Sequence, residues 1–140
     1  PDVEMFFNEA TRCLRNNGQI IMVEPWNTKW SKQIYTRLHH EPFVDDCASW
    51  QIPQIGPLSG ANQALPWIVF ERDKIIFEQK YPQLEVISRH SLMPFSYLVS
   101  GGVSLRSLTP SFMYRFFRIL ENMLPQEKWG MFSLIELRLK

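Results

Sequence analysis

The sequence lacks the features that would place it in a specialised class of protein. No apolar run approaches the ~18 to 20 residues that cross a bilayer, and no basic-then-apolar segment marks a secretion signal at its start. Only two cysteines, Cys13 and Cys47, are present, which is too few for a disulfide framework. These absences predict a protein without a membrane span, in a reducing, cytoplasmic compartment.

An excess of one charge is missing as well. Fifteen basic residues stand against fourteen acidic ones, so the formal charge is +1. A dedicated nucleic-acid binder carries a basic patch or stripe, and this balance argues against nucleic acid as a partner. Apolar residues make up 45% of the chain and charged residues 21%, as in ordinary globular proteins, and 140 residues suit one domain over residues 1–140.

The first part of the chain predicts a helix, a stop and a buried strand. Apolar residues recur at spacings of three and four from Asp2, a plausible N-cap, to Arg15. The sequence Asn-Asn-Gly at 16–18 then ends the helix. The unbroken apolar run at 20–23 predicts a strand that is buried on both faces and has a neighbour along each edge.

The rest of the chain predicts an alternation of helices and strands. The expected elements are a helix over 26–40, a lid or loop insertion over 41–61, a helix over 62–80 that breaks near Pro66 or Asp73, a strand over 84–92, a helix from Thr109 to Leu124 and a strand over 131–139. We therefore expect an α/β fold with three strands, of which the last two are antiparallel and form a sheet edge. The apolar first strand indicates that earlier strands of a larger sheet are missing.

Residues 7–25, FNEATRCLRNNGQIIMVEP, resemble the class I S-adenosylmethionine-dependent methyltransferases of the broad type 11 group. The family pattern is a helix that ends in R-x-L-[KR]-x-x-G and a strand that ends in E-P. The stretches at 39–42 (HHEP) and 60–67 (GANQALPW) are similar to a bacterial subgroup. The resemblance covers nearly the whole chain but only about half of a typical member, and it implies the C-terminal part of a Rossmann-like methyltransferase sheet.

The chain departs from this family at the methyl-donor site. Such enzymes hold S-adenosylmethionine on a glycine-rich turn after their first strand, and this chain has no G-x-G; the pair Gly101-Gly102 follows no buried strand. The resemblance implies a chain that starts after the fourth strand, and Pro1 in place of Met fits a processed or truncated product. We expect the parent protein to bind S-adenosylmethionine and this chain alone to bind none.

Candidate pocket residues follow the first strand and the long loop. Ligands of open α/β sheets bind beyond the carboxyl ends of the strands, which makes Glu24, Trp26 and Asn27 candidates for the wall of an acceptor or cofactor pocket. Alternatively, Trp26 belongs to the core and Glu24 caps the next helix. Asn62 and Gln63 are candidates for hydrogen bonds to a methyl acceptor, or cap a helix.

The densest group of reactive side chains is His39-His40-Glu41, with Asp45, Asp46 and Cys47 nearby. His39 or His40 could act as a general base, because histidine titrates near neutral pH. The group matches no recognised zinc spacing, so we expect no metal site. A helix end followed by a solvated polar loop is the third interpretation.

Two further apolar faces are expected in the core. Cys13 falls on the apolar side of the first helix, where it would be inert packing. The helix from Thr109 carries an apolar stripe that we expect to pack in the core; its residues are Phe112, Phe116, Ile119, Leu120 and Met123. A membrane surface is the rival interpretation of this stripe, and Glu121 argues against an anionic surface.

Two hypotheses follow for function. The first is the C-terminal portion of a methyltransferase, which supplies the acceptor-side pocket and the sheet edge for an unidentified small-molecule acceptor. The second is a non-catalytic α/β module that binds a partner or itself, because a sheet with a bare edge favours pairing with another copy.

Overall fold

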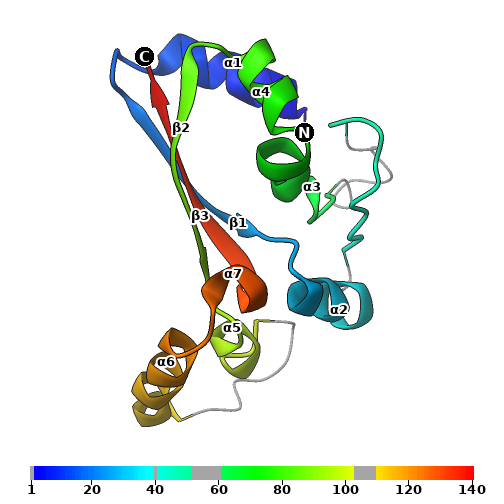
Figure 1. Ribbon diagram of the computed structural model, residues 1–140, viewed down its shortest axis with the longest axis vertical. Helices are drawn as coiled ribbons and strands as arrows, with labels where there is room; N and C mark the ends of the chain where they lie inside the picture. The colour runs from blue at the N-terminus through cyan, green and yellow to red at the C-terminus, as the bar shows by residue number, and fades with distance from the viewer. Residues whose placement is uncertain (1, 40, 52–60, 103–109) are drawn as a thin grey trace.

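The computed structural model describes residues 2–39, 41–51, 61–102 and 110–140. Three strands cross the molecule, and helices gather at its ends and on one side (Figure 1). The strands are β1 (Gln19–Pro25), β2 (Leu84–Leu92) and β3 (Phe132–Leu139). The helices are α1 (Val3–Cys13), α2 (Lys29–Leu38), α3 (Leu65–Trp67), the π-helix η1 (Ile68–Arg72), α4 (Lys74–Lys80), α5 (Ser96–Val99), the 3-10 turn η2 (Ser111–Met113), α6 (Tyr114–Asn122) and α7 (Gln126–Trp129).

The sheet places the last strand in the middle. Its order is β1-β3-β2, and β3 runs antiparallel to both neighbours, so β1 and β2 point the same way. A register shift between Val86 and Ser88 interrupts the pairing of β2 with β3. The predicted antiparallel pairing of the last two strands is confirmed, and the chain is an α/β protein with an open three-stranded sheet.

The core lies between one face of the sheet and the helices α1, α3 and α4 (Figure 1). Every second residue of β3 is buried, including Ile135, Leu137 and Leu139. From α1, the ring of Phe7 meets those of Phe77 and Tyr81 at centroid distances of 5.1 and 5.2 Å. One ring of α1 thus ties the N-terminal helix to the core.

Local signals explain where the helices begin and end. Asp2 caps α1, as predicted, by accepting a hydrogen bond from the Glu4 N–H at 2.8 Å. The helix predicted from residue 26 begins at Lys29 instead, because Thr28 caps it with a capping box completed by Ser31. The expected break in the third helical segment falls at Asp73, where α4 starts.

The first strand is not buried on both faces, contrary to the prediction. Ile21 and Val23 are 61% and 51% exposed, whereas Ile20 and Met22 pack against the core. Within the described part of the chain, β1 has β3 as its only partner strand. The apolar run at 20–23 therefore has a covered face and an uncovered one, and β1 forms an edge.

Two other burial predictions are wrong. Cys13 is exposed, because α1 turns Phe7 rather than its last turn toward the core. The apolar stripe of α6 faces outward, since the side of this helix that packs inward carries Phe117 and Glu121.

The predicted cap Thr109 lies outside the described residues. Among the helices of the described segments, none has the length and apolar character to cross a bilayer.

Candidate functional site

A pocket opens beside the carboxyl-terminal half of β1, between α1 and the start of α3. Its volume is about 400 Å³, and apolar side chains form most of its wall. It is lined by Asp2, Val3, Phe6, Phe7, Met22, Glu24, Leu65, Pro66, Val69 and Phe70. Of the three residues after the apolar run that the sequence offered for a pocket wall, Glu24 lines this pocket, and Trp26 and Asn27 do not.

Glu24 is the pocket residue that the sequence singled out. It occupies the second-last position of β1, and its side chain is half-buried. Burial raises the pKa of the Glu24 carboxyl above its usual range, because an apolar surrounding disfavours the charged form. A carboxyl with a raised pKa holds its proton to higher pH than an exposed glutamate does.

A second polar group forms where the end of α2 meets the segment before α3. Gln63 Nε2 lies 2.7 Å from His39 Nδ1 and donates a hydrogen bond to Glu41 Oε2 at 2.9 Å. Gln63 is buried, and its Oε1 has no hydrogen-bond partner among the described residues. We call His39, Glu41 and Gln63 the histidine cluster. It leaves one buried acceptor atom for a donor from a ligand.

Aromatic residues surround the histidine cluster. The ring of Tyr35 lies 6.1 Å from that of His39 and stacks on Phe43 at 5.2 Å. Tyr35 donates a hydrogen bond to the Met131 carbonyl at 2.6 Å, and burial raises the pKa of its hydroxyl. Burial also raises the pKa of the Tyr97 hydroxyl, with a smaller contribution from the charge of Glu41. The cluster therefore lies against a partly desolvated aromatic wall.

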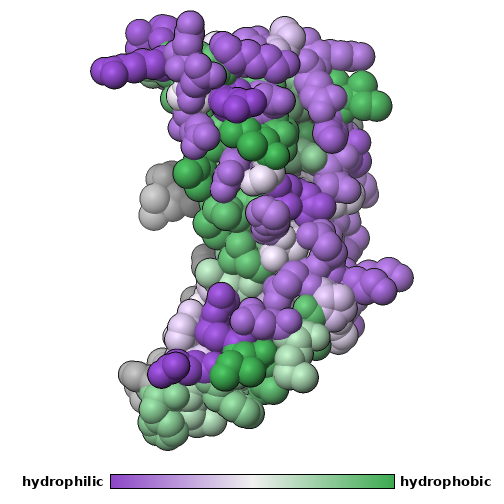
Figure 2. All heavy atoms as spheres, turned by 60° about the vertical axis from the view of Figure 1, so that its left-hand side comes forward, coloured by the Kyte–Doolittle hydropathy of each residue, from purple (hydrophilic) through white to green (hydrophobic). Residues whose placement is uncertain are grey.

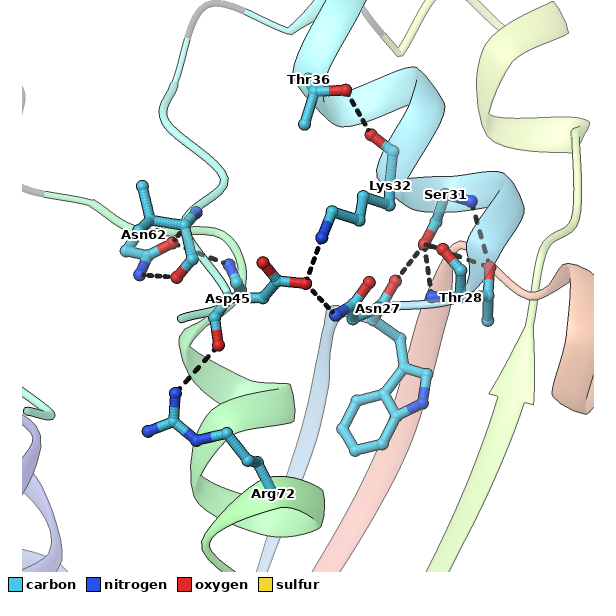
Figure 3. A network of polar contacts seen from close by, with 11 residues as sticks. Asn27, Thr28, Ser31, Lys32, Thr36, Asp45, Asn62 and Arg72 are labelled. Carbon is cyan, nitrogen blue, oxygen red and sulfur yellow. Dashed lines mark hydrogen bonds and ion pairs between the residues drawn. The ribbon is translucent and has the colours of Figure 1, made fainter. Parts of the chain in front are cut away.

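A network centred on Asp45 fixes the loop that leads away from this cluster (Figure 3). Asp45 Oδ2 accepts hydrogen bonds from Lys32 Nζ at 2.5 Å and from Asn27 Nδ2 at 2.9 Å. Arg72 Nη1 reaches the Asp45 carbonyl at 2.9 Å. Asn62 adds two bonds to the Val44 backbone, at 3.0 and 2.8 Å. The described half of the predicted lid, 41–51, is thus tied to α2 and to η1.

The structure separates the predicted site residues by role. Trp26 is 3% exposed with the Arg89 guanidinium 4.8 Å from its ring centre, so it belongs to the core. Asn27 and Asn62 hold the loop rather than line the pocket.

Glu24 lines the pocket, and Gln63 joins His39 across 24 positions of sequence. His40 lies outside the described residues.

Sequence reasoning missed several members of these sites. The pocket walls Phe6, Val69 and Phe70 lie on helix faces whose spacing predicts core, and such spacing does not distinguish a pocket wall from a core contact. No sequence pattern indicated Tyr97 as a site residue, because its proximity to Glu41 arises only from the tertiary fold. Lys32 and Asp45 are 13 positions apart and carry opposite charges, which is too common a pattern to indicate a pair.

Neither a cluster of metal-ligating side chains nor a glycine-rich turn from a strand into a helix is present among the described residues. No three of their His, Cys, Asp or Glu side chains converge into a possible metal site. The two turns that lead from a strand into a helix, 26–28 and 93–95, contain no glycine, and the buried Trp26 fills the first. Close approach of the backbone to a nucleotide needs glycine in such a turn.

Comparison with known proteins adds no assignment. No protein family, no curated protein and no solved structure matches this chain.

Proposed function

We propose that this chain is the C-terminal portion of an S-adenosylmethionine-dependent methyltransferase and supplies its acceptor-side pocket and sheet edge. One observation carries the proposal: Glu24 lies at the carboxyl end of β1 in the wall of an apolar pocket. Ligands of open α/β sheets bind at that end of the strands. The stretch 7–25, which carries the resemblance to methyltransferases, forms the later part of α1 and all of β1, and its residues Phe7, Met22 and Glu24 line this pocket.

The bare side of β1 supports the same proposal. Its outer edge has no partner among the described strands, and Ile21 and Val23 are exposed on its uncovered face. Parallel sheets are covered by helices on both faces, and the larger sheet that the resemblance implies would be covered in this way. We infer that further parallel strands continue the sheet beyond β1, and that they carry the glycine-rich turn for the methyl donor.

The residues of this chain would act on the methyl acceptor. The apolar wall around Phe6, Val69 and Phe70 would exclude water and hold the acceptor in one orientation. In the histidine cluster, which does not line this pocket, His39 is the candidate base for a hydroxyl proton, and Gln63 Oε1 would accept a hydrogen bond from a molecule bound at the cluster. Two residues that the sequence proposed separately, His39 and Gln63, would therefore both contact a methyl acceptor that binds at the cluster.

The experiment that tests this proposal is a calorimetric titration of S-adenosylmethionine. It is done with the 140-residue chain and with the longer protein that contains the upstream strands. We expect the longer protein to bind and the 140-residue chain to give no heat of binding, because the donor turn lies upstream. Failure of the longer protein to bind would contradict the proposal. Binding by the 140-residue chain would show that the methyl-donor site does not lie upstream.

A matched pair of variants then addresses the pocket. In the longer protein, Glu24→Gln should lower turnover of the methyl donor by at least about tenfold if the carboxyl handles a proton or orients the acceptor. Glu78→Gln, on the exposed side of α4, should leave turnover unchanged. Equal turnover of the two variants would remove Glu24 from the site.

A non-catalytic self-associating module is the second candidate. The observation in its favour is again the exposed edge strand β1 with Ile21 and Val23, because such an edge is a template for pairing with a second copy. In this second candidate, another molecule covers the exposed side of β1. In the first candidate, more of the same chain covers it.

A further inference from the structure

The helix α6 and the turn η2 lie at the end of the molecule opposite α1 and the C-terminus (Figure 1). Four apolar side chains at spacings of four, three and four residues form one outward stripe. They are Phe112, Phe116, Ile119 and Met123, and they are 79%, 54%, 61% and 78% exposed. Such spacing places side chains on a single side of a helix. Hydrophobic residues gather at this end of the molecule in the space-filling view (Figure 2).

The orientation of the stripe is fixed by the opposite side of the helix. Phe117 packs edge-on against Phe95, with the ring centres 5.8 Å apart. Glu121 is completely buried, and its Oε1 accepts hydrogen bonds from the N–H groups of Phe95 at 2.9 Å and Ser96 at 2.6 Å. Because these contacts hold α6 on the start of α5, the helix does not rotate its apolar stripe into the core.

The charges on α6 are of one sign at the surface. Arg115 is exposed and Arg118 partly so, while Glu121, the only acid of the helix, is buried and paired with Arg118 at 3.2 Å. The acid that argued against an anionic surface in the sequence is therefore hidden from it. The outer side of α6 presents an apolar stripe with a cationic flank.

We propose that α6 binds the surface of an anionic phospholipid bilayer. The helix would lie in the plane of the membrane, with Phe112, Phe116 and Met123 at the boundary of headgroups and acyl chains. Arg115 would face the lipid phosphates. An amphipathic helix with large apolar residues on one side and cations beside them binds in this way, and its nine residues are far too few to span the bilayer.

The charges favour a lipid surface over a second copy of the chain. In a symmetric pair, the same patch of each copy faces the other. The arginines of two α6 helices would then approach each other, and α6 has no exposed acid to pair with them. A bilayer that contains anionic lipid supplies the opposite charge over a whole plane.

The test is co-sedimentation of the protein with vesicles. One set contains phosphatidylcholine alone, and the other contains about one third phosphatidylglycerol, which makes it anionic. We expect binding to the anionic vesicles and much weaker binding to phosphatidylcholine. Phe112→Ser and Phe116→Ser should each weaken binding about tenfold through lost apolar contact. Arg115→Gln should weaken it about fivefold, and added salt should reduce this difference.

Matched controls come from the other end of the molecule. Met5 and Ile75 are each 69% exposed, on α1 and α4, so Met5→Ser and Ile75→Ser remove comparable apolar surface. These variants should bind as the unmodified protein does, and all variants should keep the same far-ultraviolet circular dichroism. Equal loss in the controls, equal binding to both vesicle types, or no binding at all would overturn the proposal. So would a dimer that Phe116→Ser dissociates in the absence of vesicle binding, since that result assigns the stripe to a second copy.

Discussion

Asp45 joins the loop after α2 to that helix through a single carboxylate. The hydrogen bond from Lys32 holds the pKa of Asp45 below its usual range, and the bond from Asn27 acts in the same direction, while partial burial opposes both. A carboxyl with a lowered pKa in the folded state stabilises the fold above its unfolded pKa of 3.8. That contribution is lost as the pH falls through the lower pKa of the folded protein.

We therefore expect Asp45→Asn to lower the free energy of unfolding by about 1 kcal/mol near neutral pH. The deficit should shrink as the pH falls below about 4, where the wild-type carboxyl also becomes neutral. Urea unfolding of both proteins over this pH range measures the difference. The exposed neighbour Asp46→Asn serves as the control. A deficit that stays constant with pH would show that the charge of Asp45 is not the cause.

At the same scale, the sequence predicted residue types better than residue roles. Glu24 stands in the wall of a pocket, and His39 meets Gln63, a contact that the sequence did not predict. Trp26 and Asn62, chosen on the same grounds, serve the core and the loop. The difference arises from which partner each side chain meets, and those partners lie 18 or more positions away in the sequence.

At the scale of elements, the sequence predicted strands and caps well. The strand over 84–92 has the predicted bounds, and α1 begins with the predicted Asp2 cap. Such features depend on neighbouring residues, which the sequence contains in full. Burial depends on what covers an element. The apolar face of α6 therefore fits core packing and surface binding equally well until the contacts of Glu121 decide its orientation.

Those contacts make Glu121 the anchor of α6. We expect Glu121→Ala to lower the free energy of unfolding by about 3 kcal/mol, because it leaves the buried Ser96 N–H and the partly buried Phe95 N–H without an acceptor and Arg118 without its partner. Hydrogen exchange of the α6 amides should accelerate in the same variant. Asn122→Ala, which changes an exposed residue of the same helix, is the control. Unchanged exchange in α6 would mean that other contacts hold the helix.

At the scale of the whole molecule, the sheet is covered on one face and partly bare on the other. The core helices pack on Ile135 and Leu137, while Ile21 and Val23 lie on the uncovered side of β1. From the apolar run at 20–23 the sequence predicted a strand buried on both faces within a larger sheet, and the structure leaves one side of this run exposed. The order of the strands was not predictable, because nothing local to β3 reports that it enters between β1 and β2.

This bare face leads to a prediction about assembly. We expect the 140-residue chain to self-associate, and Ile21→Lys with Val23→Lys to shift it toward the monomer, because like charges on the paired faces repel and the buried apolar area is lost. Sedimentation velocity over a range of concentrations measures the change. Ile75→Lys with Ile76→Lys, on the exposed side of α4, is the matched control.

The same measurement separates the two candidate functions. If helices of the upstream part of a methyltransferase cover this face, the longer protein should show no such association. The double lysine variant should instead destabilise it by several kcal/mol through buried charge. If the chain is a self-associating module, the longer protein should associate through this face as the 140-residue chain does. A 140-residue chain that stays monomeric at every concentration would contradict the self-associating module. That result would favour a longer protein whose own upstream part covers the exposed face of β1.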